Sequence, residues 1–179
     1  MTTVVRFQID HIRFLDPQGE PLGPLPDFAH DPAQLVPLYR AMYLTRTFDA
    51  KAIALQRTGK LGTFASALGQ EAIGVGVASA MRTEDALFPS YREHAAQLVR
   101  GVRIDESLRY WGGDERGSDF AEARHDFPNC VPIATQVCHA AGAAYAFRLR
   151  GEPRVAVSFL GDGASSKGDF YEGLNFAAV

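Results

Sequence analysis

The fold depends most on residues 154–163, Arg-Val-Ala-Val-Ser-Phe-Leu-Gly-Asp-Gly, where a run of β-forming residues leads directly into a glycine turn. Residues 154–160 predict a short buried strand, and such a run is typical of a parallel sheet. A helix is predicted to open near Ser166, because Ser166 and Asp169 fit a capping box. Since helical patterns lie on both sides of the strand, the sequence predicts an α/β fold with a parallel sheet and flanking helices.

The turn Gly161-Asp162-Gly163 has the chemistry of a phosphate site. Ligands of open α/β sheets bind beyond the carboxyl ends of the strands, where helix N-termini offer free N–H groups. Glycines allow positive φ angles and a close approach of the backbone to the ligand. A carboxylate would repel a bare phosphate, so Asp162 indicates a Mg²⁺ ion between the two.

Two other interpretations of this turn remain open. Asp-Gly is a common pair in ordinary tight turns, and such a turn needs no ligand. A dinucleotide-binding fingerprint is less favoured, because Ser166 stands where its third glycine belongs.

A second candidate site is Pro-Ser-Tyr-Arg-Glu at residues 89–93. Ser90 and Glu93 predict the N-cap and the N3 position of a helix, with Tyr91 and Arg92 in its first turn. A phenol and a guanidinium placed there would form a clamp for phosphate, because arginine donates in a bidentate manner. The alternative is a surface arginine beside a half-buried tyrosine.

Residues 1–33 differ in character from the rest of the chain. Val5, Phe7 and Ile9 alternate with polar residues and predict a short strand, while the prolines that follow exclude a long helix. We therefore expect an extended N-terminal arm over 1–33 and a folded domain over 34–179. Spacing and breakers predict helices from Pro32 (with Asp31 as N-cap) to Gly59, from Gly69 to Met81, from about Ser90, over 105–111, and from about 136 to Gly151, with an exposed loop at 112–129.

Composition narrows the class of protein. With 179 residues, 46% hydrophobic and 22% charged, the chain is neither disordered nor a coiled coil. A net charge of -3 disfavours a nucleic-acid binder. No apolar stretch predicts a membrane span or a secretory signal, and Cys130 and Cys138 lack a metal-binding pattern. We expect a cytoplasmic protein with reduced thiols that behave as small buried apolar groups.

Several stretches together resemble a known family, the alpha subunit of the thiamine-diphosphate-dependent 2-oxo acid dehydrogenase E1 component, of the pyruvate or the closely related branched-chain type. The resemblance covers the N-terminal part of that subunit. The matching stretches occur in the family's order at residues 38–49, 57–62, 69–72, 88–93, 134–136, 142–146 and 161–178. Residues 34–179 are then expected to be the N-terminal part of a thiamine-diphosphate-binding domain that holds the diphosphate side.

The resemblance also implies roles for individual residues. Tyr91 and Arg92 match the pair that binds the cofactor diphosphate, and Asp162 matches the Mg²⁺ ligand. The aminopyrimidine contacts match Val131 and Ile133. The remaining matches are Gly161, Gly163 and Ala164 beside the diphosphate and Cys130, Pro132, Thr135 and Gln136 in a loop that binds K⁺ in some members.

In this family the cofactor decarboxylates a 2-oxo acid and the acyl group passes to lipoyl on an E2 acyltransferase. The resemblance implies an E1 beta subunit as partner in an α2β2 assembly, which supplies the activating glutamate. Glu71 is therefore expected at a solvated helix position and Glu93 in a cap. His94 is the histidine closest to the expected site.

The resemblance places a further metal ligand and the substrate loop beyond Val179, so the C-terminal part of the fold is expected to be missing and the chain to be inactive alone. Two alternatives remain: a non-catalytic fragment that only binds the beta subunit, and an unrelated α/β nucleotide-binding domain.

Overall fold

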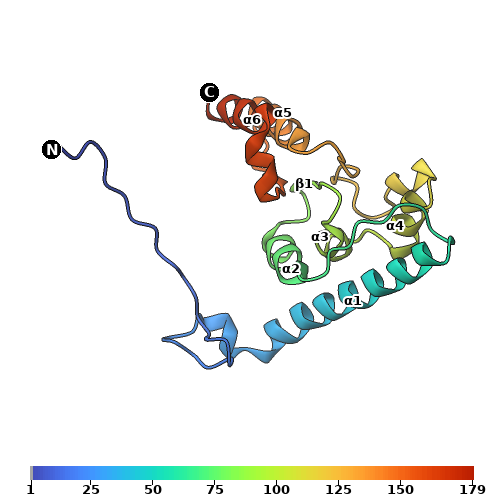
Figure 1. Cartoon of the computed structure of the whole chain (residues 1–179). Helices are drawn as coiled ribbons and strands as arrows, with labels where there is room; N and C mark the ends of the chain where they lie inside the picture. Colours follow the sequence, from blue (N-terminus) through green and yellow to red (C-terminus); the bar gives the residue numbers. More distant parts are fainter. Residues whose placement is uncertain (1) are drawn as a thin grey trace. The chain divides into compact units, whose positions relative to one another are not determined.

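A computed structural model describes residues 2–179, which fall into two units: the residues up to Pro37, and Leu38–Val179 (Figure 1). Helix α1 (Pro32–Arg57) crosses the boundary between them. Its start is the predicted one, because the Asp31 carboxylate accepts a hydrogen bond from the Ala33 N–H at 2.9 Å. It ends two residues before Gly59, which adopts a positive φ of 68°.

The first unit is mostly extended. The predicted strand around Val5–Ile9 is not formed within the described residues 2–37, where Phe7 is 79% exposed. A strand requires a hydrogen-bonded neighbour, and alternation alone does not supply one. The regular features are an isolated antiparallel bridge between Leu15 and Pro21 and a 3-10 turn, η1 (Asp27–His30).

The second unit contains helices around a two-stranded parallel sheet. Its helical elements are α2 (Glu71–Ala80), α3 (His94–Val99), α4 (Ile104–Trp111), η2 (Glu115–Ser118), α5 (Thr135–Arg150), η3 (Asp162–Ser166) and α6 (Gly168–Ala178). Most lie where the sequence predicts helices. The capping box at Ser166 was a wrong prediction, because Ser166 belongs to the 3-10 turn η3 and α6 begins only at Gly168. No helix within residues 2–179 is long and apolar enough to cross a membrane.

The sheet pairs β1 (Ala86–Phe88) with β2 (Ala156–Ser158), with Leu87 opposite Val157. Strand β2 is shorter than the predicted 154–160. Strand β1 was not predicted, because three residues carry no periodicity. Ala86 and Phe88 pack against α5, whereas Leu87 packs against α2 and α3. The prediction of parallel strands with helices on their faces is therefore confirmed.

The segment 112–129 is less exposed than predicted. Phe120 and Ala123 are buried with Val102. The Asp126 carboxylate accepts hydrogen bonds from the Leu87 N–H at 3.1 Å and from the Arg100 guanidinium, in an ion pair whose two side chains are almost completely buried. A buried carboxylate needs such partners. The end of this segment is thus held beside β1.

Glu71 is buried, which corrects the expectation of a solvated position. At the start of α2, its carboxylate pairs with the Arg46 guanidinium from α1 and accepts the Gly69 N–H at 3.2 Å. The Arg46 hydrogen bond, opposed by burial, lowers the pKa of Glu71 to about 2. The connection between α1 and α2 is held a second time by Asp49, which accepts from the Ser66 hydroxyl and the Ala67 N–H, both at 2.7 Å.

Helices α2 and α3 pack so closely that one glycine of α2 cannot carry a side chain. A Cβ atom at Gly74 would lie 2.6 Å from the Ala95 Cβ, whereas one at Gly76 would meet nothing within 4 Å. We expect Gly74→Ala to lower the free energy of unfolding by about 1–3 kcal/mol. The matched Gly76→Ala should raise it by up to about 1 kcal/mol through helix propensity. Urea denaturation measures both, and equal effects would contradict the close α2–α3 contact.

The Arg46–Glu71 pair predicts a stability that depends on pH. Because the pKa of Glu71 is lower in the folded chain than its ordinary 4.5, its contribution is complete above 4.5 and disappears as the pH falls through about 2. We expect Glu71→Gln to lower the free energy of unfolding by about 0.5–1 kcal/mol at pH 7. The difference from the wild type should shrink between pH 5 and pH 2.

The matched control for this prediction is Asp119→Asn, which removes an exposed carboxylate paired with Arg124. Its free energy of unfolding at pH 7 should stay within about 0.5 kcal/mol of that of the wild type, because exposed ion pairs contribute little. A constant gap between Glu71→Gln and the wild type down to pH 2 would contradict the assigned ion pair.

Candidate functional site

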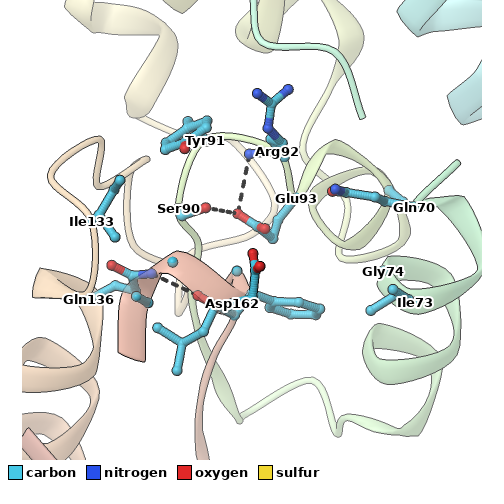
Figure 2. Close-up of a pocket in the computed structure, with 16 residues that line it drawn as sticks. Gln70, Ile73, Gly74, Ser90, Tyr91, Arg92, Glu93, Ile133, Gln136 and Asp162 are labelled. Carbon is cyan, nitrogen blue, oxygen red and sulfur yellow. Dashed lines mark hydrogen bonds between the residues drawn. The ribbon is translucent and has the colours of Figure 1, made fainter. Parts of the chain in front are cut away.

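A pocket of about 350 Å³ opens where the two parallel strands end (Figure 2). Carboxyl ends of parallel strands lie at the same edge of a sheet, so the segments after β1 and β2 become neighbours there. Helix α2, Ala95 of α3 and the region where α5 begins contribute the remaining walls. The lining residues are Gln70, Ile73, Gly74, Ser90, Tyr91, Arg92, Glu93, Ala95, Ile133, Gln136, Phe159, Leu160, Gly161, Asp162, Gly163 and Ala164.

The wall that follows β1 is the stretch Ser90–Glu93. The Glu93 carboxylate accepts hydrogen bonds from the Ser90 hydroxyl at 2.7 Å and from the Arg92 N–H at 3.3 Å. These bonds make a turn instead of the predicted cap, and α3 begins only at His94. Tyr91 and Arg92 therefore precede the helix, although both still line the pocket.

The Arg92 side chain is already occupied by protein atoms. Its guanidinium donates to the carbonyl oxygen of Ser66 and lies 5.2 Å from the centre of the Tyr91 ring. Figure 2 shows it pointing away from Asp162. The sequence places Arg92 correctly at the pocket but does not reveal this partner.

The wall that follows β2 is the turn Gly161–Ala164, which leads into η3. Asp162 is exposed, and its carboxylate points toward Ser90 and Glu93 (Figure 2). Neither Gly161 nor Gly163 has a positive φ, which corrects that part of the prediction. Both glycines instead border open space, because a Cβ atom at either position would meet no atom within 4 Å.

The wall where α5 begins is built from Ile133, in the loop before the helix, and from Gln136 in its first turn. The Gln136 side chain is 2% exposed and its amide N–H donates to the Phe159 carbonyl at 2.7 Å, which ties α5 to the end of β2. Its amide oxygen has no hydrogen-bond partner within residues 2–179. Ala134 between them is buried with a positive φ of 69°, a conformation that costs a non-glycine residue free energy.

The other residues of the predicted potassium loop, Cys130, Pro132 and Thr135, do not line the pocket. Cys130 and Pro132 line a neighbouring hollow, also of about 350 Å³, together with Val131, Phe88 and Phe127. Gln136 borders both cavities. The Pro132 carbonyl accepts the Thr135 N–H at 3.3 Å, so the loop forms a closed turn. The resemblance implies that Val131 and Ile133 both contact the aminopyrimidine, but the structure places them at different cavities.

Both cysteines are free thiols, as expected, but they are half-buried and not fully buried. Burial raises the pKa of the Cys130 thiol, and the nearby negative charge of Asp169 acts in the same direction. The Cys138 thiol donates to the Asp169 carbonyl at 3.5 Å.

His94 lies behind the pocket wall and does not line it. Its ring stacks on Phe64 at 4.9 Å between centroids and meets Trp111 edge-on. One ring nitrogen, Nε2, is 2.9 Å from the Ala65 carbonyl, and the other has no partner within residues 2–179. Burial lowers the pKa of His94, so the neutral ring donates from Nε2 to this carbonyl.

The sequence did not identify several residues of the pocket. Gln70, Ile73 and Gly74 come from the start of α2, and the stretch Gly-Gln-Glu-Ala at 69–72 was the available signal. Glu93 was assigned to a cap, yet its carboxylate lies in the pocket (Figure 2). Within residues 2–179 no group of three or more His, Cys, Asp or Glu side chains is arranged to hold a metal.

Comparison with known proteins identifies the family to which the chain is related. The family described as "Dehydrogenase E1 component" matches residues 39–179. The chain is 36% identical over 164 residues to the pyruvate dehydrogenase E1 component subunit alpha of Mycoplasma genitalium, covering 92% of this chain and 46% of the relative. A corresponding subunit of Staphylococcus aureus (strain Mu50) is 36% identical over 174 residues, or 96% of this chain and 46% of the relative.

A third relative carries a different name. It is the 3-methyl-2-oxobutanoate dehydrogenase subunit alpha of Mycobacterium tuberculosis, 45% identical over 142 residues, or 79% of this chain and 39% of the relative. The chain thus spans less than half the length of these curated relatives. Because the family match extends over most of the chain and includes every wall of the pocket, the chain belongs to the dehydrogenase E1 component family.

Proposed function

We propose that this chain acts as the alpha subunit of a 2-oxo acid dehydrogenase E1 component and that its pocket holds the diphosphate of thiamine diphosphate with Mg²⁺. The observation that carries the proposal is the convergence of Tyr91, Arg92 and Asp162 on one pocket at the carboxyl ends of two parallel strands. Membership of the E1 family supports it and excludes the unrelated nucleotide-binding domain.

The residues present fit such a group. The open space beside Gly161 and Gly163 admits phosphate oxygens close to the backbone. Asp162 is an exposed carboxylate at the same turn. Mg²⁺ commonly takes one or two carboxylates and completes its octahedral shell with phosphate oxygens and water, so a single carboxylate at this wall suits it.

Each wall then has a role in binding. Asp162 holds the metal ion, and Tyr91 and Arg92 donate to the diphosphate from the opposite wall. Ala164, buried behind the turn, keeps Gly161–Gly163 in place. Ile133 offers apolar surface to the aminopyrimidine, while Val131, which faces the neighbouring hollow, would act through its backbone.

When bound, thiamine diphosphate supplies the nucleophilic carbon and the electron sink for decarboxylation of a 2-oxo acid. The proposed substrate is pyruvate or a branched-chain 2-oxo acid, with the acyl group passing to lipoyl on an E2 acyltransferase. The chain would work with an E1 beta subunit, in an α2β2 assembly in the cytoplasm. The beta subunit is then the source of the activating carboxylate, and this chain contributes binding and orientation.

A potassium ion in the loop Cys130–Gln136 is part of the same proposal. It is supported by the buried amide oxygen of Gln136, which lacks a partner within residues 2–179. An unpartnered buried oxygen is costly, and a cation ligated by oxygen would satisfy it. The thiol of Cys130 is a poor potassium ligand, so backbone carbonyls and Gln136 would carry the site.

Pyruvate and 3-methyl-2-oxobutanoate differ only in apolar substituents, for which pockets discriminate weakly. The kcat/KM values of the E1 assembled with its beta subunit, measured with both acids as carbon dioxide release, decide between them.

We expect Asp162→Asn to weaken Mg²⁺-dependent binding of thiamine diphosphate at least about tenfold, because the metal loses its anionic ligand from this chain. The measurement is titration calorimetry on the chain assembled with its beta subunit. Asp114→Asn is the matched control, since that carboxylate pairs with Arg116 in η2, outside the pocket lining. Unchanged affinity in Asp162→Asn would contradict the assigned metal site, and no cofactor binding by the wild type would favour a subunit that only binds its partner.

A further inference from the structure

Arg92 contributes the strongest anion-binding chemistry to the pocket, yet its guanidinium is bound to a backbone carbonyl. The acceptor is Ser66, which lies in the connection between α1 and α2. Arg92 is half-buried and its long side chain rests on the Tyr91 ring, at 5.2 Å from the ring centre. Such a side chain can rotate between acceptors without movement of the backbone.

The segment around Ser66 is held at three successive residues. The Ala65 carbonyl lies 2.9 Å from Nε2 of His94, the Ser66 carbonyl accepts from Arg92, and the Ala67 N–H donates to Asp49 at 2.7 Å. His94 and Asp49 are buried, so these two contacts are shielded from the pocket. Of the three, only the Arg92 contact uses a residue that lines the pocket.

A diphosphate is a stronger acceptor for Arg92 than a peptide carbonyl is. Hydrogen bonds between a guanidinium and a phosphate join two opposite charges and are frequently bidentate, whereas in a bond to a peptide carbonyl only the donor is charged. An anion in the pocket would therefore draw Arg92 away from Ser66. The Ser66 carbonyl would then lose the hydrogen bond from Arg92 and accept one from water instead.

We propose that Arg92 is shared between two acceptors, the Ser66 carbonyl in the empty pocket and the anionic group of the ligand in the filled one. Filling the pocket thus loosens Ser66 and Leu68, while His94 and Asp49 keep Ala65 and Ala67 in place. The identity of the anion as a diphosphate rests on the proposed function. Arg92 acts here as a positioning residue for a segment that leads into the pocket through Gln70.

The test is hydrogen exchange of the peptide 64–70 in the chain assembled with its beta subunit, with and without thiamine diphosphate and Mg²⁺. We expect the ligand to raise exchange of this peptide about threefold or more in the wild type. Arg92→Gln should show the raised exchange without ligand and no further rise with it. Ser66→Ala keeps the carbonyl but removes the hydroxyl, which donates to Asp49 and accepts the Leu68 N–H at 3.2 Å. Its exchange without ligand should therefore be higher than that of the wild type, and it should still rise when the ligand is added.

Arg116→Gln is the control, because the Arg116 guanidinium, in η2, pairs with Asp114 outside the pocket lining and its loss should leave the peptide unaffected. Calorimetry on the same samples separates the two proposals. Wild-type protein that binds no thiamine diphosphate would overturn both the proposed function and the exchange of partners. Binding with unchanged exchange of residues 64–70, or Arg92→Gln with exchange like the empty wild type, would overturn only the sharing of Arg92.

Discussion

The parallel pairing of β1 with β2 is the constraint on which the site depends. It brings residues 86–88 beside residues 156–158, although residues 89–155 separate the two strands along the chain. Parallel strands point their carboxyl ends the same way, so the chain must leave both strands at one edge. This strand geometry brings Tyr91 and Asp162 to the same pocket, and it does so without a direct interaction between the two side chains.

The sheet is small, and hydrogen bonds from outside the two strands do much to hold its edge. Gln136 connects α5 to the Phe159 carbonyl after β2, and the Cys130 N–H donates to the Pro89 carbonyl after β1 at 3.1 Å. Each bond satisfies a backbone group that a longer strand would have paired within the sheet. The same bonds bring the loop before α5 to the pocket, so the two cavities share Gln136 as a common wall.

Local sequence signals predicted the parts of this structure that depend on local interactions. The start of α1 at its Asp31 cap, the end of α5 at Gly151 and the turn after β2 all follow from a few adjacent residues. Two signals of the same kind failed. The motifs Ser90–Glu93 and Ser166–Asp169 both fit a capping box, yet each serine lies in a turn before its helix begins.

Long-range contacts were beyond the reach of such signals. Strand β1 is too short for a pattern, and the partners of Glu71, Asp126 and His94 lie between 25 and 39 residues away. The pocket could be predicted through Tyr91, Arg92, Ile133 and Gly161–Ala164, because those residues belong to recognisable stretches. Its α2 wall and the separation of Val131 from Ile133 depend on how helices pack around the sheet, which no single stretch encodes.

The buried side chain of Arg100 helps to explain why the chain contains many more arginines than lysines. Its guanidinium reaches the carbonyls of Arg82, Thr83 and Asp85 as well as Asp126, and Arg154 reaches the Glu84 carbonyl while its charge lies over the Phe147 ring. The two guanidinium groups thus hold the segment that precedes β1 through hydrogen bonds to its carbonyl oxygens. An ammonium group has neither the planar geometry nor the reach to join so many oxygens. The chain uses 15 arginines and only 3 lysines, and the guanidinium groups of Arg82, Arg92, Arg100 and Arg154 join backbone segments that are distant in the sequence.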